Sequence, residues 1–198
     1  RGSKRALVTV DMPFGSYEKS PQQAFENAAR IMSETGCQAI KIESGTYAAD
    51  TIDFMAQRSI PVMGHIGLRP QAAMADGGYK AKGRTAAERQ RVIDEAKATA
   101  DAGAFAIVVE GVAEDLALEI TEQVSVPTIG IGASAACDGQ ILVTQDMLGV
   151  FEWTPKFVKR YDNQAERTAA AVARYADEVR NRTFPATAQV YTMKRQDG

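Results

Sequence analysis

Cysteine, histidine and long apolar runs are all scarce in this sequence. The two cysteines, Cys37 and Cys137, have no CxxC neighbour, which excludes the disulfide framework of a secreted protein and favours a reduced, cytoplasmic setting. No apolar run approaches the roughly 18 residues that indicate a membrane span. The first residues, RGSKRALVTVDMPF, lack the apolar region and cleavage site of a signal peptide. These absences predict a cytoplasmic protein with no membrane partner.

An excess of charge of one sign is also lacking. The chain has 23 Lys and Arg against 25 Asp and Glu, a net charge of -2, so nucleic acid is not expected as a partner. Hydrophobic residues make up 45% and charged residues 24%, which is ordinary for a globular protein. A chain of 198 residues can bury one sizeable core. We expect one domain over residues 1–185 and a C-terminal tail at 186–198.

Short apolar segments alternate with longer amphipathic ones along the chain. Such alternation predicts a parallel sheet covered by helices. Ser20 is the expected N-cap of the first helix, and Gly36 its expected end. The predicted strands are 6–11, 38–43, 60–68, 105–110, 126–132 and 141–144, and the predicted helices are 21–36, 46–59, 86–103, 114–124 and 163–182.

Polar residues inside the predicted strands favour a barrel over an open sheet. Strands of an open parallel sheet are buried on both faces and are near-continuous apolar runs, whereas Lys41 and Glu43 share one face of their strand. No GxGxxG or GxxxxGK[ST] loop follows the first strand. We therefore expect an α/β fold of the (β/α)8 TIM type. Because such barrels need about 250 residues, we expect the first roughly two β/α units to be missing from this chain.

Three acidic residues, Asp11, Glu43 and Glu110, each end a predicted strand. Carboxylates that converge repel one another unless a cation lies between them. Mg²⁺ takes oxygen ligands, often one or two carboxylates together with substrate oxygens and water. Asp11 and Glu43 come from consecutive strands and are well placed to share one ion. The alternative is that each acid lies exposed at a loop edge or forms a structural ion pair.

Three further features are candidates for a site. A lysine inside a barrel is costly unless paired, so Lys41 either holds a substrate carboxylate or pairs with an interior acid such as Glu43. His65, the only histidine, is a poor basis for a metal site; it is either structural, a hydrogen-bond donor, or an acid or base. Gly130 and Gly132 can bring backbone N–H groups to a ligand, although glycines also simply permit tight turns.

Eight segments together resemble the ketopantoate hydroxymethyltransferase family. They occur in the family's order with compatible spacing and extend to residue 185. Each motif is moderately specific, and their combination leaves little room for chance. The segments are VTVDMPFGSY (8–17), SPQQAFENAARIM (20–32), AIKIESG (39–45), IPVMGHIGLRPQ (60–71), GGYKAKGRT (77–85), AGAFAIVVEGV (102–112), VPTIGIGASAACDGQILVTQDMLG (126–149) and PKFVKRY (155–161).

The resemblance implies an eight-stranded barrel, Mg²⁺ dependence and small-molecule substrates. The family transfers a hydroxymethyl group from 5,10-methylenetetrahydrofolate, a folate cosubstrate, to 3-methyl-2-oxobutanoate, giving 2-dehydropantoate in pantothenate biosynthesis. Matched motif by motif, it implies that Asp11 and Glu43 bind the metal and that Asp11 and Lys41 contact the substrate. Glu110 is implied as the proton acceptor that forms a Mg²⁺-stabilised enolate. A homo-oligomer, commonly a decamer, is also implied.

The chain departs from the family pattern in three places. KIESG stands where the family usually has KxEGG, and Gly111 follows the strand that ends in Glu110; both changes are mild. The family's Asp-Ser pair, which binds metal and substrate, has no counterpart here, and we expect it in the missing units. Two alternatives stay open: a Mg²⁺-dependent 2-oxo acid lyase or mutase of the phosphoenolpyruvate mutase type, whose KKCGH-like loop is not found, and an inactive barrel fragment.

Overall fold

The computed structural model describes residues 3–192. The chain divides into two compact units, Arg1–Ile141 and Leu142–Gly198. The predicted domain boundary at residue 185 stays a prediction, and residues 193–198 of the predicted tail lie outside the described residues.

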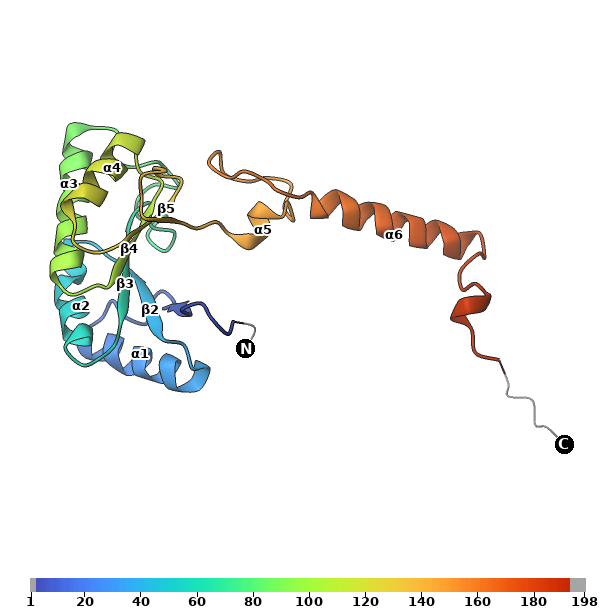
Figure 1. Ribbon diagram of the computed structural model, residues 1–198, viewed down its shortest axis with the longest axis horizontal. Coiled ribbons are helices and arrows are strands. Elements are labelled where there is room, and N and C mark those ends of the chain that lie inside the picture. The colour runs from blue at the N-terminus through green and yellow to red at the C-terminus, as the bar shows by residue number, and fades with distance from the viewer. Residues whose placement is uncertain (1–2, 193–198) are drawn as a thin grey trace. The chain divides into compact units, whose positions relative to one another are not determined.

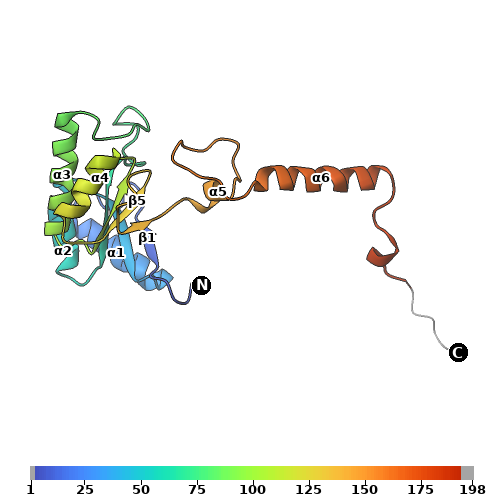
Figure 2. The same cartoon turned by 45° about the horizontal axis from the view of Figure 1, so that its top comes forward.

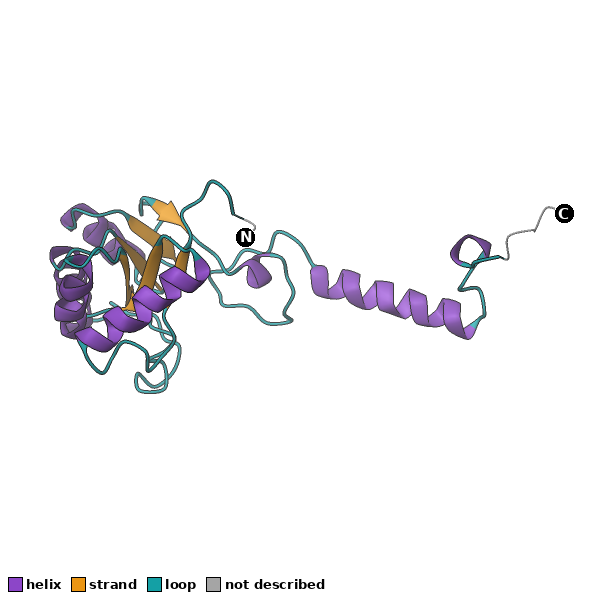
Figure 3. Cartoon of the chain, turned by 90° about the horizontal axis from the view of Figure 1, so that it is seen from below, coloured by secondary structure: helices purple, strands orange, loops and turns teal. Residues whose placement is uncertain are grey.

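The first unit is built on a curled, six-stranded parallel sheet (Figure 3). Its strands lie in the order in which they occur along the chain, whereas a doubly wound sheet reverses its strand order at a switch point. The α/β class and the barrel-like curl are therefore confirmed, and closure into eight strands stays a prediction. The strands are β1 (Thr9–Asp11), β2 (Ala39–Glu43), β3 (Val62–Gly67), β4 (Ala106–Glu110), β5 (Thr128–Ile131) and β6 (Gly139–Gln140).

Helices cover one face of this sheet (Figure 1, Figure 2). The predicted ends of the first helix are confirmed: the Ser20 hydroxyl accepts the N–H of Gln23 at 3.1 Å, and Gly36 closes the helix with a left-handed φ of 71°. The helices are α1 (Pro21–Thr35), α2 (Ala49–Ala56), which follows the 3-10 turn η1 (Thr46–Ala48), α3 (Ala86–Asp101) and α4 (Glu114–Gln123).

Alternating side chains of the strands form the core. Ile40 and Ile42 of β2 are buried in a cluster that includes residues of α1 and α2, whereas Ile107 and Val109 of β4 are buried in a cluster with residues of α3 and α4. Because side chains alternate along a strand, the residues between them face the concave, helix-free side of the sheet. The predicted division of β2 into an apolar and a polar face is confirmed.

The predicted sixth strand at 141–144 is wrong. Pairing with β5 occurs earlier, at Gly139–Gln140. The Asp138 carboxylate accepts both the backbone N–H of Thr128 at 2.8 Å and its hydroxyl at 3.1 Å, which fixes the register upstream of the apolar run. The run itself ends in a short helix, α5 (Thr144–Met147). A polar side-chain contact therefore overrides the β-propensity of the ILVT segment.

The regular structure described in the second unit is helical. Its long helix, α6 (Gln164–Arg180), lies within the predicted range 163–182, and a 3-10 turn, η2 (Thr187–Gln189), follows. Among residues 3–192, no helix has both the length and the apolarity needed to cross a bilayer.

Helix α3 packs very closely on β3 at Gly64. A methyl group at this position would overlap the Cγ2 of Thr99 and would lie 2.9 Å from the Ser44 hydroxyl. That hydroxyl accepts hydrogen bonds from the Thr99 hydroxyl at 3.2 Å and from the backbone N–H of His65 at 3.1 Å. The contact therefore fixes the backbone from which His65 projects.

We expect Gly64→Ala to destabilise the protein by about 1–3 kcal/mol, because the added methyl overpacks the α3–β3 contact. Thr99→Ser removes the opposing methyl and keeps the hydroxyl, so the double variant should recover part of the loss. Urea unfolding of the parent, both single variants and the double variant measures these differences. A Gly64→Ala variant as stable as the parent would contradict the close packing.

Candidate active site

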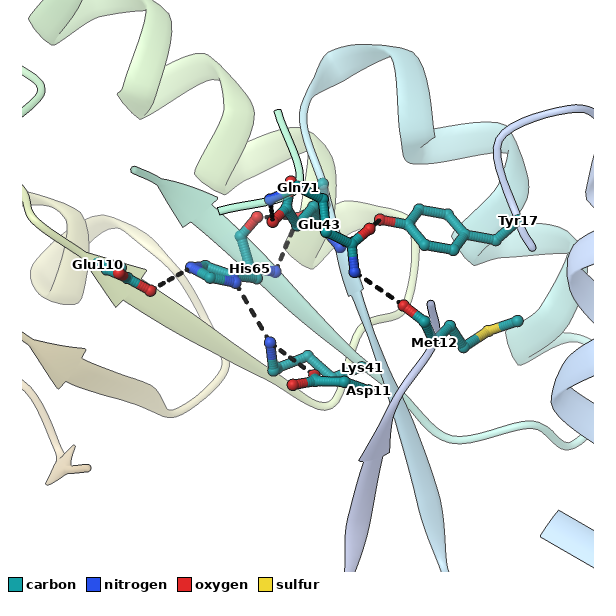
Figure 4. A network of polar contacts seen from close by, with 9 residues as sticks. Asp11, Met12, Tyr17, Lys41, Glu43, His65, Gln71 and Glu110 are labelled. Carbon is teal, nitrogen blue, oxygen red and sulfur yellow. Dashed lines mark hydrogen bonds and ion pairs between the residues drawn. The ribbon is translucent and has the colours of Figure 1, made fainter. Parts of the chain in front are cut away.

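A continuous row of polar side chains crosses four neighbouring strands on the concave face (Figure 4). Asp11 ends β1, Lys41 lies in β2, His65 in β3, and Glu110 ends β4. The Lys41 Nζ lies 2.7 Å from Asp11 Oδ1 and 3.2 Å from His65 Nδ1. On its other side, His65 Nε2 lies 3.0 Å from Glu110 Oε2. Four of the residues singled out from the sequence are thus brought into contact.

The contacts of His65 fix which ring nitrogen carries the proton. A lysine ammonium has three donors and no acceptor, so the Nδ1 that it meets must be an unprotonated acceptor. The proton of the neutral ring then lies on Nε2, facing Glu110. The Nε2–H points off the line to the carboxylate and makes no well-formed hydrogen bond. The contact between the buried His65 ring and Glu110 is therefore electrostatic.

The ion pair of Lys41 forms with Asp11 and not with Glu43. The Asp11 side chain is 63% exposed and that of Lys41 is 21% exposed. Ion pairs in water contribute only about 0–1 kcal/mol, so little free energy is lost when the ammonium turns to another anion. The pair is thus compatible with Lys41 binding a carboxylate ligand.

Glu43 has a different environment from the other two acids. Its side chain is buried, and its two oxygens accept backbone N–H groups from consecutive residues after β3: Gln71 at 2.6 Å and Ala72 at 3.2 Å. The predicted repulsion between the acids is thus relieved in two ways. Lys41 and His65 lie between Asp11 and Glu110, and backbone amides bind Glu43.

The oxygen donors of Asp11 and Glu43 suit a hard cation. Among residues 3–192, no group of three or more His, Cys, Asp or Glu side chains is arranged to hold a metal ion. Mg²⁺ does not need such a cage, because it commonly binds one or two carboxylates and takes its remaining oxygens from substrate and water. An ionised carboxylate has about four lone-pair positions, so the two N–H groups on Glu43 leave acceptor capacity. The donors are therefore of the chemical type that Mg²⁺ prefers.

Sequence reasoning missed two residues that contact Glu43 or its partners, Tyr17 and Gln71 (Figure 4). The Tyr17 hydroxyl donates to Gln71 Oε1 at 2.7 Å and accepts the backbone N–H of Glu43 at 3.3 Å. Gln71 Nε2 donates to the carbonyl of Met12 at 2.9 Å. Their residue types alone indicate no chemistry. They could have been found only because Tyr17 lies in segment 8–17 and Gln71 in segment 60–71, two of the segments that resemble the family.

The two glycines of the predicted ligand-binding loop have structural roles. A Cβ at Gly130 would lie 3.0–3.1 Å from the Gln140 side chain and the Cys137 Sγ, so these groups would have to shift by a few tenths of an ångström to admit a larger residue. Gly132 adopts a left-handed φ of 61°. A role for either glycine in ligand binding stays a prediction.

Known proteins similar to this chain agree on one family. The family model described as ketopantoate hydroxymethyltransferase matches residues 1–187. The 3-methyl-2-oxobutanoate hydroxymethyltransferase of Maricaulis maris (strain MCS10) is 82% identical over 198 residues, which are 100% of this chain and 71% of that protein. The protein of the same name from Hyphomonas neptunium (strain ATCC 15444) is 67% identical over 196 residues, 99% of this chain and 71% of that protein.

One solved structure supports the fold alone. The crystal structure of a candidate phosphonomutase from Burkholderia cenocepacia J2315 superposes with a TM-score of 0.52 at 19% sequence identity. The match covers 85% of this chain and 68% of that one. At this identity, the likeness indicates a shared α/β architecture and carries no function.

The lone histidine makes the proton position directly testable by ¹⁵N NMR, since one ring gives one pair of signals. We expect His65 Nδ1 to have the chemical shift of an unprotonated nitrogen and Nε2 that of a protonated one. Lys41→Met removes the donor to Nδ1 and should release the ring to a mixture of tautomers. Lys97→Met, on the exposed face of α3, is the matched control and should change nothing. A protonated Nδ1 in the parent, or an unchanged ring in Lys41→Met, would contradict the assignment.

Proposed function

Since the chain belongs to the ketopantoate hydroxymethyltransferase family and is a transferase, we propose that it transfers a hydroxymethyl group to a 2-oxo acid. The donor is 5,10-methylenetetrahydrofolate and the acceptor is 3-methyl-2-oxobutanoate, so that 2-dehydropantoate is formed in pantothenate biosynthesis. The observation that carries this proposal is the row of contacting side chains from Asp11 to Glu110. It places the Lys41 ammonium and the Glu110 carboxylate on the same concave face of the sheet.

Lys41 and Glu110 have complementary roles in this reaction. The Lys41 ammonium, released from its exposed partner Asp11, neutralises the carboxylate of the keto acid. Glu110 is the general base that removes the proton from the branched carbon next to the ketone. His65 holds these two side chains at opposite sides of its ring. The enolate carbon then forms a bond to the one-carbon unit of the folate, water supplies the hydroxyl oxygen of the new hydroxymethyl group, and tetrahydrofolate is released.

Asp11 and Glu43 are the proposed metal ligands. Mg²⁺ bound there supplies Lewis acidity to the oxygens of the 2-oxo acid. Asp11 also contacts the substrate directly, since its carboxylate is the exposed member of the row. Glu43 is held by the backbone amides of Gln71 and Ala72, which orients its carboxylate before any ligand arrives.

The proposal extends to the rest of the active protein. The six parallel strands form one wall of an eight-stranded barrel, and two further β/α units complete it and supply the Asp-Ser pair of the metal and substrate sites. Two observations support this view: the sheet is open, and the match to the Maricaulis maris relative covers 71% of that protein. We further propose that the enzyme is cytoplasmic and assembles as a homo-oligomer, a decamer by family resemblance.

A Mg²⁺-dependent 2-oxo acid lyase or mutase is the alternative function, because it too would bind a 2-oxo acid through a Mg²⁺ held by carboxylates. Product formation that depends on 5,10-methylenetetrahydrofolate favours the transferase. Turnover of a 2-oxo acid without any folate favours the alternative.

We expect Glu110→Gln to lower turnover by about 10²–10⁴-fold, because the amide cannot accept the substrate proton. Mg²⁺ binding should stay nearly unchanged, since Glu110 is not a proposed ligand. Exchange of the proton at carbon 3 of 3-methyl-2-oxobutanoate, followed by NMR in D₂O, measures the step itself. Glu122→Gln, exposed on α4, is the control. Normal turnover in Glu110→Gln would remove this residue from the base role.

Glu43→Gln should raise the Mg²⁺ concentration needed for half-maximal activity, because a neutral amide oxygen binds a hard cation more weakly than a carboxylate does. Activity measured across a Mg²⁺ titration gives this concentration for the parent and the variant. Glu34→Gln, exposed on α1, is the matched control. An unaltered titration in Glu43→Gln would overturn the ligand assignment.

A further inference from the structure

We propose that Gln71 is a positioning residue that fixes the separation of the two carboxylates of the proposed metal site, Asp11 and Glu43. The inference rests on the proposed function, because that function makes these two acids metal ligands. Gln71 itself touches neither metal nor substrate in this account. It acts by connecting the backbone beside Asp11 to the side chain of Glu43.

Gln71 contacts Glu43 through its backbone. Its N–H donates to Glu43 Oε1 at 2.6 Å, and the next N–H, from Ala72, donates to Oε2 at 3.2 Å. Both carboxylate oxygens are therefore oriented by one short segment. Since Glu43 is only 5% exposed, the carboxylate cannot exchange these amides for water without opening the segment.

Gln71 contacts the Asp11 side through its amide. Its Nε2 donates to the carbonyl of Met12, the residue that follows Asp11, at 2.9 Å. Met12 is fully buried and its own N–H donates to the carbonyl of Lys41 at 2.9 Å. The end of β1 is thus tied both to β2 and to Gln71. One glutamine links the ends of the two strands that carry the proposed ligands.

Tyr17 closes the network and fixes the orientation of the Gln71 amide. Its hydroxyl donates to Gln71 Oε1 at 2.7 Å and accepts the N–H of Glu43 at 3.3 Å. The Met12 carbonyl can only accept, so the Gln71 amide presents Nε2 to it and Oε1 to the Tyr17 hydroxyl, which removes the ambiguity of an amide flip.

The segment that carries Gln71 has anchors of its own. Before it, the N–H of Leu68 donates to the carbonyl of Glu110 at 2.8 Å. After it, the Lys82 ammonium lies 2.9 Å from the Asp76 carboxylate and holds the pKa of Asp76 below its usual range. Loss of the Gln71 side chain therefore leaves the segment attached to the sheet. What it removes is the link between Met12 and Glu43.

This link preorganises the metal site. Groups that hold metal ligands in place typically change metal affinity by about 10–100-fold when they are removed. Without the Gln71 amide, the end of β1 keeps its contacts with β2 but loses its link to the segment that holds Glu43, so Asp11 gains freedom relative to Glu43. Metal binding must then reorder this strand end, which lowers the affinity.

The test uses Mn²⁺ as the probe, with free Mn²⁺ followed by electron paramagnetic resonance in the absence of any substrate. Gln71→Met keeps the length of the side chain and the backbone N–H but removes both amide hydrogen bonds. We expect its Mn²⁺ dissociation constant to rise by about 10-fold or more, while its thermal midpoint without metal stays near that of the parent. Gln57→Met, at the exposed end of α2, is the matched control and should bind as the parent does.

Tyr17→Phe supplies an independent variant, since it removes the hydroxyl that orients the amide. If the two residues act as one unit, the double variant should weaken binding by less than the product of the two single effects. Hydrogen exchange at the Gln71 and Ala72 amides is the second readout and should be faster in both variants. Equal Mn²⁺ affinity in Gln71→Met and the parent would overturn the inference, as would a loss of the same size in Gln57→Met.

Glu43→Gln separates this inference from the proposed function. If Glu43→Gln weakens Mn²⁺ binding and Gln71→Met does not, Glu43 is supported as a metal ligand and only the positioning role of Gln71 is contradicted. If Glu43→Gln leaves binding unchanged, or if the parent binds no Mn²⁺, the proposed metal site falls and the inference falls with it.

Discussion

The polar face of the sheet depends on the fact that a lysine ammonium donates hydrogen bonds and accepts none. Lys41 lies between Asp11 and His65, so its position determines which oxygen and which ring nitrogen must be acceptors. The proton of His65 therefore lies on Nε2, the ring nitrogen on the side of Glu110. A single cation thus orders charges across four strands that would otherwise repel one another or lie unpaired on a concave surface.

Much of the fold followed from the sequence because alternation along a strand is a local property. Ile40 and Ile42 are buried against helices, whereas Lys41 and Glu43 lie on the opposite side of β2, as a period of two requires. The ends of α1 were equally local, since Ser20 and one glycine decide them. Where local signals agree with tertiary packing, the prediction is confirmed.

The errors and omissions share a different cause. The sixth strand was misplaced because Asp138 reaches back to Thr128, a contact between residues whose spacing shows no periodicity. The positions of Gln71 and Tyr17 were missed because their hydrogen bonds join a loop to two strand ends. Sequence patterns report which face a side chain occupies. They do not report which loop amide will fold back onto a buried carboxylate.

The sequential order of the strands has a consequence for how the chain folds. Each strand from β2 to β6 pairs with the one just before it, so each addition closes only the loop formed by the intervening segment. Loops of this size have a modest entropy of closure, and contacts of limited sequence separation favour rapid folding. The sheet can therefore grow stepwise from its N-terminal edge during synthesis, and Lys41 can meet His65 before Glu110 has left the ribosome.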